Sequence, residues 1–261
     1  VFYSANDCDV RSKKKSKKIL NKKKIYVKHS ILKENGANFY ESYYLQHSKN
    51  LPLIDAKVAI SKDYFTISKK KRWITNSQSR RRSHLLRSMY SCIISTSKSI
   101  NDDNSLLDCR IDGLQKKSPD LIIIDRALKL KKRLRLFKTI KKRKVILFTI
   151  SDKNKKISYL KKRGVKVITM KSLVNKDDFT KLFFIIKKMG YHRIFVETGL
   201  TFLNFLIKNK FLKSIYIFKS STYLKKLGFN LPKSNLLKKI ALKNQINVNL
   251  FGDKLYKENL K

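Results

Sequence analysis

Short apolar runs without polar alternation recur along most of this chain. The clearest are Leu121–Ile124, Val145–Thr149 and Ser214–Phe218. Apolar residues at every position, instead of every second one, are typical of strands buried on both faces. Because helical patterns separate these runs, the chain is predicted to be an α/β protein with a mostly parallel sheet flanked by helices.

The predicted elements follow one another in a βα order. Strands are expected at Val1–Ser4, Ile25–Lys28, Ile54–Ile60, Cys92–Ser95, Leu121–Ile124, Val145–Thr149, Val165–Thr169, Arg193–Val196 and Ser214–Phe218. Helices are expected at Ser12–Lys22, Glu34–His47, Ser77–Met89, Asn154–Arg163, Lys176–Met189 and Thr201–Lys208. Asn76 or Ser77 is suited to cap the third helix, and Pro52 indicates a boundary. A hairpin of Ile246–Phe251 and Lys254–Lys257 around Gly252-Asp253 is expected to close the sheet.

The chain carries a large positive charge, with 63 basic and 18 acidic residues and a formal net charge of +45. One interpretation is a protein that binds nucleic acid. The other is a Lys-rich background, because lysines occur in almost every segment instead of marking one arm or one face. We favour the second interpretation. Such a field would still attract anionic substrates.

The cysteines and the apolar segments indicate a reduced, cytoplasmic protein. Cys8, Cys92 and Cys109 have no CxxC spacing, so neither a disulfide framework nor a structural zinc site is expected. No segment reaches the ~18 apolar residues of a membrane span, so no membrane partner is expected. The chain begins with Val in an apolar run, which suggests the interior of a longer product.

Several common ligand motifs are absent. The sequence has no GxGxxG and no GxxxxGK[ST], and it has no HxE followed by PCxxC. A Rossmann fingerprint, a P-loop and a zinc deaminase site are therefore not expected in this chain, and no metal ligands are predicted.

The stretch from Lys57 to Arg110 departs from the Lys-rich background. On its predicted helix, Arg80, His84 and Arg87 share one face at i, i+4 and i+7. A solvated basic face is the plainer interpretation, and phosphate capture by Arg87 is the functional one. Trp73 is either a core aromatic or a ring that stacks on a ligand.

Two further sites lie where predicted strands end. Asp125-Arg126 follows LIII, and ligands of open α/β sheets bind at the carboxyl ends of strands. Arg126 could meet the extra phosphate of NADP, or form an ordinary strand-end ion pair. Glu197-Thr198-Gly199 precedes a helix, where backbone amides can approach a phosphate. A simple βα turn is the alternative.

In this order, these pieces resemble the reductase domain of the bifunctional riboflavin-biosynthesis deaminase/reductase, the RibD family. The residues that carry the resemblance are Lys57-Ala59-Ser61-Asp63, Trp73-Ile74-Thr75, Leu86-Arg87, Asp103 to Arg110 and Val196-Glu197-Thr198-Gly199. The resemblance covers about residues 51–261 and implies a dihydrofolate-reductase-like domain there. Residues 1–50, with VFYSANDCDVR and IYVKHSILKENGANF, resemble the end of the family's deaminase domain and imply a small α/β remnant of a cytidine-deaminase-like domain.

The resemblance implies NADPH-dependent reduction of 5-amino-6-(5-phosphoribosylamino)uracil, a phosphorylated pyrimidine ribotide, to the ribitylamino product of riboflavin biosynthesis. Zinc would belong only to the deaminase half, whose ligands would precede Val1. Two alternatives stay open: a basic nucleic-acid-binding protein, and an inactive reductase fragment. A homo-oligomer is one expectation for its assembly.

Residue by residue, the resemblance implies three groups of site residues. The catalytic positions are Lys57 and Glu197. The substrate-binding positions are Lys71, Arg87, Leu107, Arg110 and Glu197. The cofactor-binding positions are Ile60, Trp73, Ser99, Asp103, Arg126, Gly199, Leu200, Thr201 and Phe202. The chain departs from the family's pattern at Tyr64, Lys71, Ser105, Thr198 and Leu200.

Overall fold

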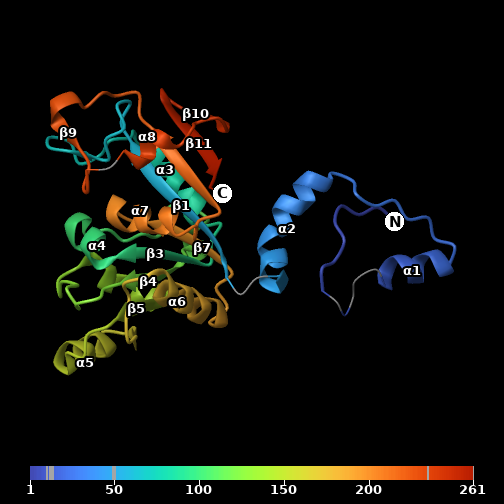
Figure 1. Ribbon diagram of the computed structural model, residues 1–261, viewed down its shortest axis with the longest axis horizontal. Coiled ribbons are helices and arrows are strands. Elements are labelled where there is room, and N and C mark those ends of the chain that lie inside the picture. Colours follow the sequence, from blue (N-terminus) through green and yellow to red (C-terminus); the bar gives the residue numbers. More distant parts are fainter. Residues whose placement is uncertain (10, 12–14, 49–50, 234, 261) are drawn as a thin grey trace. The chain divides into compact units, whose positions relative to one another are not determined.

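A nine-stranded sheet organises the larger of two units into which the chain divides (Figure 1). The structure, a computed structural model, describes residues 1–9, 11, 15–48, 51–233 and 235–260. Unit 1 comprises Val1–Leu53 with Thr180–His192, and unit 2 comprises Ile54–Phe179 with Arg193–Lys261. All residues of the site described below belong to unit 2.

The strand order of the sheet is β10-β11-β8-β1-β7-β3-β4-β5-β6. Strand β1 runs parallel to β8, and β7, β3, β4, β5 and β6 form a parallel series, whereas β10 and β11 are antiparallel. The strands are β1 Leu53–Ile60, β3 Cys92–Thr96, β4 Asp120–Ile124, β5 Val145–Thr149, β6 Val165–Thr169, β7 Arg193–Glu197, β8 Ser214–Lys219, β10 Gln245–Leu250 and β11 Asp253–Asn259. A mostly parallel sheet was the expectation, and the predicted fold class is confirmed.

The helices follow the predicted order, with two additions, α4 and the short α8. They are α1 Lys15–Lys22, α2 Lys33–Ser48, α3 Ser77–Arg87, α4 Ser97–Asp103, α5 Asn154–Lys162, α6 Lys176–Lys188, α7 Leu200–Lys208 and α8 Leu236–Lys239. Asn76 caps α3, because its side chain accepts a hydrogen bond from the Ser79 backbone N–H at 3.0 Å. None of the described helices is long and apolar enough to cross a membrane.

The central strands are buried except at some of their end residues. Ile93, Ile122 and Leu147 are fully buried, and all five residues of β5 are buried. Burying one such side chain contributes about 1.5–3 kcal/mol, so these runs form the most stable part of unit 2. A rigid sheet of this kind holds the carboxyl ends of its strands in fixed relative positions.

Helix α4 was not predicted. No helix was expected between the predicted strands Cys92–Ser95 and Leu121–Ile124, and SKSINDD has no apolar period. The helix forms because Thr96 caps it, accepting from the Ser99 N–H at 3.3 Å, and because Ile100 is fully buried. Its carboxyl end brings Asp102 and Asp103 to the site. The two-stranded sheet of β2 (Ile67–Ser68) and β9 (Gly228–Phe229) was also missed, since two-residue strands leave no periodic signal.

The closing hairpin is present, but its turn lies one residue earlier than predicted. Leu250 pairs with Asp253, so the turn residues are Phe251 and Gly252. Both have positive φ, 50° and 91°, as the two central residues of a type I′ turn must. Asp253 is the first residue of β11, and its buried carboxylate accepts from the Asn76 N–H and the Ser79 hydroxyl.

Two strands predicted in unit 1 are wrong. Val1–Ser4 and Ile25–Lys28 do not form strands; they meet at one parallel bridge between Phe2 and Lys28. A third strand and a buried face are what stabilise such short segments, and Phe2 and Tyr26 are instead exposed. The predicted helix start at residues 12–14 lies outside the described residues.

Candidate active site

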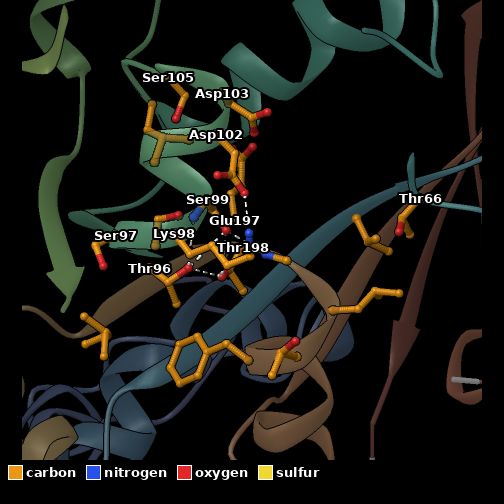
Figure 2. A pocket seen from close by; sticks show the side chains of 18 of the residues that line it. Thr66, Thr96, Ser97, Lys98, Ser99, Asp102, Asp103, Ser105, Glu197 and Thr198 are labelled. Atoms are coloured by element: carbon orange, nitrogen blue, oxygen red, sulfur yellow. Dashed lines mark hydrogen bonds and ion pairs between the residues drawn. The ribbon is translucent and has the colours of Figure 1, made fainter. Parts of the chain in front are cut away.

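A cleft of about 1480 Å³ lies at the carboxyl ends of β3, β4 and β7 (Figure 2). It brings together nearly all of the residues singled out in the sequence. Its lining includes Lys57, Lys71, Trp73, Arg87, Ser99, Asp103, Leu107, Arg110, Arg126, Glu197, Gly199, Leu200, Thr201 and Phe202. Ile60 does not line it. That side chain is fully buried at the end of β1, and its carbonyl accepts from the Ser220 N–H.

The floor of the cleft is an ion-pair cluster of Lys57, Arg87 and Glu197. Arg87 at the end of α3 donates from Nε to Glu197 Oε1 at 2.6 Å and from Nη2 to Oε2 at 3.0 Å. Lys57 Nζ, from the middle of β1, lies 3.9 Å from Glu197 Oε2. All three side chains are less than one-fifth exposed. The bidentate pair is the geometry that makes an arginine–carboxylate contact strong.

The floor charges change one another's proton affinity. Burial alone would raise the pKa of Glu197, but Arg87 and Lys57 outweigh it and lower that pKa to about 2. Burial lowers the pKa of Lys57, and the attraction of Glu197 only partly opposes this. At neutral pH Glu197 is therefore a carboxylate, and Lys57 is the floor group whose proton is easiest to remove.

Arg87 is largely occupied by the protein itself. Besides Glu197, it donates from Nη1 to the Asp108 carbonyl at 2.9 Å. Each guanidinium nitrogen thus has a partner within the protein. Arg87 faces the cleft, yet few of its N–H groups remain for a ligand.

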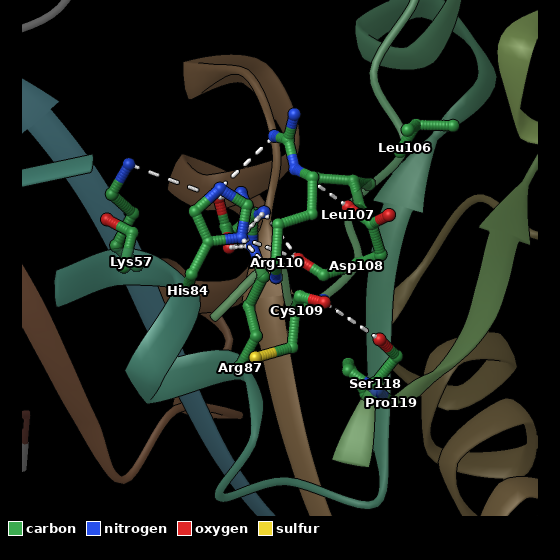
Figure 3. A network of polar contacts seen from close by, with 12 residues as sticks. Lys57, His84, Arg87, Leu106, Leu107, Asp108, Cys109, Arg110, Ser118 and Pro119 are labelled. Carbon is green, nitrogen blue, oxygen red and sulfur yellow. Dashed lines mark hydrogen bonds and ion pairs between the residues drawn. The ribbon is translucent and has the colours of Figure 1, made fainter. Parts of the chain in front are cut away.

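His84 is a site residue that was not predicted, although it shares a helix face with Arg87. Its Nδ1 lies 2.8 Å from the Asp108 carbonyl, and its Nε2 lies 3.1 Å from Arg110 Nη2 (Figure 3). Burial, and then the charge of Arg87, lower its pKa to about 4. A neutral ring with its proton on Nδ1 donates to the Asp108 carbonyl and accepts from Arg110 Nη2 at Nε2. The Arg110 backbone N–H, 3.3 Å from Nδ1, is then not accepted by the ring.

Hydroxyl groups surround the amino end of α7 (Figure 2). Thr96 and Ser99 lie 3.0 Å apart, and Thr198 lies 3.4 Å from the Thr96 hydroxyl. Gly199 donates its N–H to Ser99 Oγ at 3.0 Å. A Cβ on Gly199 would meet only that oxygen, at 3.6 Å, so this position does not require glycine.

Trp73 lies at the edge of the cleft and is 53% exposed. The guanidinium carbons of Arg72 and Arg80 lie 4.9 and 5.2 Å from its ring centre. Arg72 also donates to the Asp103 carbonyl at 2.9 Å. The tryptophan is therefore not a core residue. Its ring contacts the guanidinium groups of Arg72 and Arg80.

The remaining predicted cations are exposed around the cleft. Lys71, Arg110 and Arg126 all have exposed side chains. Asp125 does not pair with Arg126: it is buried and accepts from Ser97 Oγ and from the Lys129 and Leu130 amides. The strand-end ion pair considered for Asp125 and Arg126 is therefore not formed. Among the described residues, no group of His, Cys, Asp and Glu is arranged to hold a metal ion.

Comparison with known proteins places this site in a family. Residues 52–224 match the family described as RibD C-terminal domain. The riboflavin biosynthesis protein RibD of Actinobacillus pleuropneumoniae is 28% identical over 185 residues, which cover 69% of this chain and 48% of that protein. The chain spans about half the length of the curated relatives it matches.

Two solved structures are similar in fold. One is the diaminohydroxyphosphoribosylaminopyrimidine deaminase/5-amino-6-(5-phosphoribosylamino)uracil reductase of Thermotoga maritima, with a TM-score of 0.80, 18% identity, and coverage of 100% of this chain and 71% of that chain. The other is the riboflavin biosynthesis reductase Rib7 of Saccharomyces cerevisiae, with a TM-score of 0.63, 20% identity, and coverage of 86% and 99%. Since the family match extends over more than half of the sequence, the chain belongs to the RibD C-terminal domain family.

Proposed function

We propose that this chain reduces 5-amino-6-(5-phosphoribosylamino)uracil with NADPH to the ribitylamino product, as a step of riboflavin biosynthesis. The observation that carries the proposal is the floor cluster of Lys57, Arg87 and Glu197, built around the carboxyl end of β7, in a chain of this family. It supplies one ionised carboxylate and one lysine with a lowered pKa beside a large cleft.

The size of the cleft favours two ligands. Pockets for a single drug-sized ligand measure roughly 300–1,000 Å³, and this cleft measures about 1480 Å³. That volume leaves room for a dinucleotide and a ribotide together.

We assign the cofactor to the end of the cleft where the Thr96, Ser99 and Thr198 hydroxyls surround the amino end of α7. The amino end of a helix attracts phosphate, and Ser99 and Thr198 add hydroxyl donors there. Arg126, exposed after β4, is the cation we assign to the extra phosphate that distinguishes NADPH from NADH. When bound, NADPH supplies the hydride for the sugar carbon C1′.

The substrate end is the side of the cleft with Arg110 and Lys71. Because the nitrogens of Arg87 are engaged by Glu197 and Asp108, we assign the substrate phosphate mainly to Lys71 and Arg110. Arg110 pairs with Asp108 Oδ1 at 3.2 Å, but its side chain is 55% exposed, against 11% for Arg87. Arg87 then holds Glu197 in one orientation instead of clamping the phosphate alone.

The floor residues divide the remaining work. Glu197, ionised at neutral pH, accepts hydrogen bonds from sugar hydroxyls and fixes the open sugar. Reduction of the C1′=N bond adds hydride to carbon and requires a proton on nitrogen. Lys57 is the floor group that can hold and deliver that proton, because its lowered pKa brings it closer to neutral.

The test is a turnover assay with the purified chain, NADPH and the deaminated ribotide. We expect saturable loss of reduced nicotinamide absorbance and a product heavier by one hydride and one proton. Two comparators are the ribotide before its deamination, tested with NADPH, and NADH, tested with the deaminated ribotide. No oxidation at saturating ligand concentrations would refute the proposal. Steeply salt-dependent binding to any duplex without turnover would instead support a nucleic-acid-binding protein.

A further inference from the structure

Arg143 is a buried cation next to the substrate end of the cleft, and it does not belong to the cleft lining. It immediately precedes Lys144 and β5, and its residue is 7% exposed. Burial lowers its pKa to about 10, so it is still charged at neutral pH. A buried charge of this kind is costly unless its partners are well placed.

The partners of Arg143 are main-chain carbonyls of the loop before β4. Nη1 donates to the Leu107 carbonyl at 2.8 Å and to the Pro119 carbonyl at 3.0 Å, and Nη2 donates to the Leu106 carbonyl. Nε has no partner among the described groups. The cation is therefore used entirely through its planar fork, which a lysine cannot reproduce.

The loop that carries these carbonyls continues to Arg110, which we assign to the substrate phosphate. Leu107 has a φ of 55°, a left-handed conformation that a leucine does not adopt without support. The next carbonyl, that of Asp108, accepts from Arg87 Nη1 and lies 2.8 Å from His84 Nδ1. Figure 3 shows Leu106, Leu107 and Asp108 in succession on this loop, with Arg110 following. Two buried arginines thus take three successive carbonyls.

We infer that Arg143 is a positioning residue for substrate binding: by holding the carbonyls of Leu106 and Leu107 it keeps Leu107 and Arg110 at the substrate end of the cleft. The inference rests on the proposed function. It extends that function to a residue that touches neither ligand. Its sequence signal is weak, since Arg143 is one of many basic residues in KKRK.

The test compares R143K with R193K. Arg193 begins β7, lies against the Tyr90 ring and is not part of the cleft lining, so its variant loses a partly buried guanidinium away from the loop. We expect R143K to raise the KM for the ribotide about tenfold with little change in kcat, because uniform binding is lost. The Kd for NADPH should change less than twofold. Hydrogen exchange of the amides at 105–110 should become faster in R143K only.

Each other outcome overturns the inference. Unchanged exchange and an unchanged ribotide KM in R143K would show that the arginine does not position the loop. Equal losses for the ribotide and NADPH would show a general structural role. R143Q, which keeps an amide donor without charge, is the second variant; failure of both to fold while R193K folds would also assign a structural role. If the unmodified chain shows no turnover, the proposed function has failed, while the exchange comparison still decides whether Arg143 holds the loop.

Discussion

The floor and the rim of the cleft use the same charged residue types in opposite ways. On the floor, the largely buried side chains of Lys57 and Arg87 share one carboxylate, that of Glu197, at 3.9 and 2.6 Å. On the rim, Lys71, Arg110 and Arg126 are exposed and line the cleft, and Arg110 also pairs with Asp108 Oδ1 at 3.2 Å. The floor is a closed electrostatic unit, whereas the rim is open to an anionic ligand.

This difference determines what each substitution can reveal. A buried ion pair is strongly coupled, so removing one partner leaves the other uncompensated and costs both stability and activity. An exposed cation contributes little to folding, so its removal should affect only the ligand that it binds. Variants whose stability and ligand affinity are measured separately can therefore test this difference between floor and rim.

The largest effect is expected for Glu197→Gln. Without the carboxylate, Arg87 and Lys57 stay charged in a buried site, so the free energy of unfolding should fall by about 3 kcal/mol or more. Turnover should fall by at least a hundredfold, since the sugar loses its acceptor. Denaturant unfolding and steady-state kinetics measure the two effects.

Glu258→Gln is the matched control. Glu258, in β11, is also buried, but it accepts from the backbone N–H groups of Lys243 and Asn244 and does not line the cleft. The control should lose stability and keep its turnover. If E258Q and E197Q lost the same stability and the same activity, the floor would have no special role.

The next effect is that of Lys57→Met. Because burial penalises the lysine charge, the variant should keep or gain stability while kcat falls by about 10²–10⁴, the range of a lost proton-transfer group. Lys219→Met is the control, since Lys219 lies on the neighbouring strand β8, bonded to the Tyr64 hydroxyl. A K57M variant with normal kcat would remove Lys57 from the chemistry.

Rim variants should give smaller and ligand-specific effects. We expect Arg110→Ala to raise the KM for the ribotide about tenfold and to leave NADPH binding unchanged, because one charge-assisted contact contributes about 1.5–3 kcal/mol at most. Arg126→Ala should raise the KM for NADPH and not that for NADH. Each variant is the control of the other, and both should unfold like the unmodified chain. Equal effects on both ligands would contradict the division of the cleft into two ends.

The sequence was sufficient for elements whose signal is local. β5 and β6 have the predicted bounds, because their apolar runs end abruptly at polar residues. Helix α4 was not predicted because one cap and one buried isoleucine stabilise it, and neither produces a periodic pattern of apolar residues. The strands expected around Phe2 and Lys28 failed because a strand needs partners that no local pattern reveals.

For the site, the sequence supplied the residues but not their pairing. Arg87 and Glu197 were each singled out, yet they lie 110 positions apart, and only the fold shows that they neutralise each other. The phosphate role expected for Arg87 therefore shifts in emphasis toward Arg110. The role of His84 was missed for the same reason, since its lowered pKa depends on burial and on the nearby charge of Arg87, which only the folded chain provides.

The smallest expected effect comes from the acid sensitivity of the boundary between floor and rim. His84 faces Arg87, Arg110 and Asp108, and its pKa in the folded chain is about 4 against an ordinary 6.5. Between these values the unfolded chain binds more protons, so stability falls as the pH decreases from 6.5 to about 4. Glu197 also stabilises the folded chain less as the pH decreases, but in a lower range: its pKa of about 2 gives stability that is lost as the pH falls below 4.5.

The test is urea unfolding at a series of pH values. His84→Gln should reduce the pH dependence of the free energy of unfolding only in the upper range, and Glu197→Gln only in the lower one. Because His84 is only partly buried, its share should be the smaller of the two. An H84Q variant with an unchanged slope above pH 4.5 would show that the histidine is not held neutral, and the link between the floor and Arg110 would be lost with it.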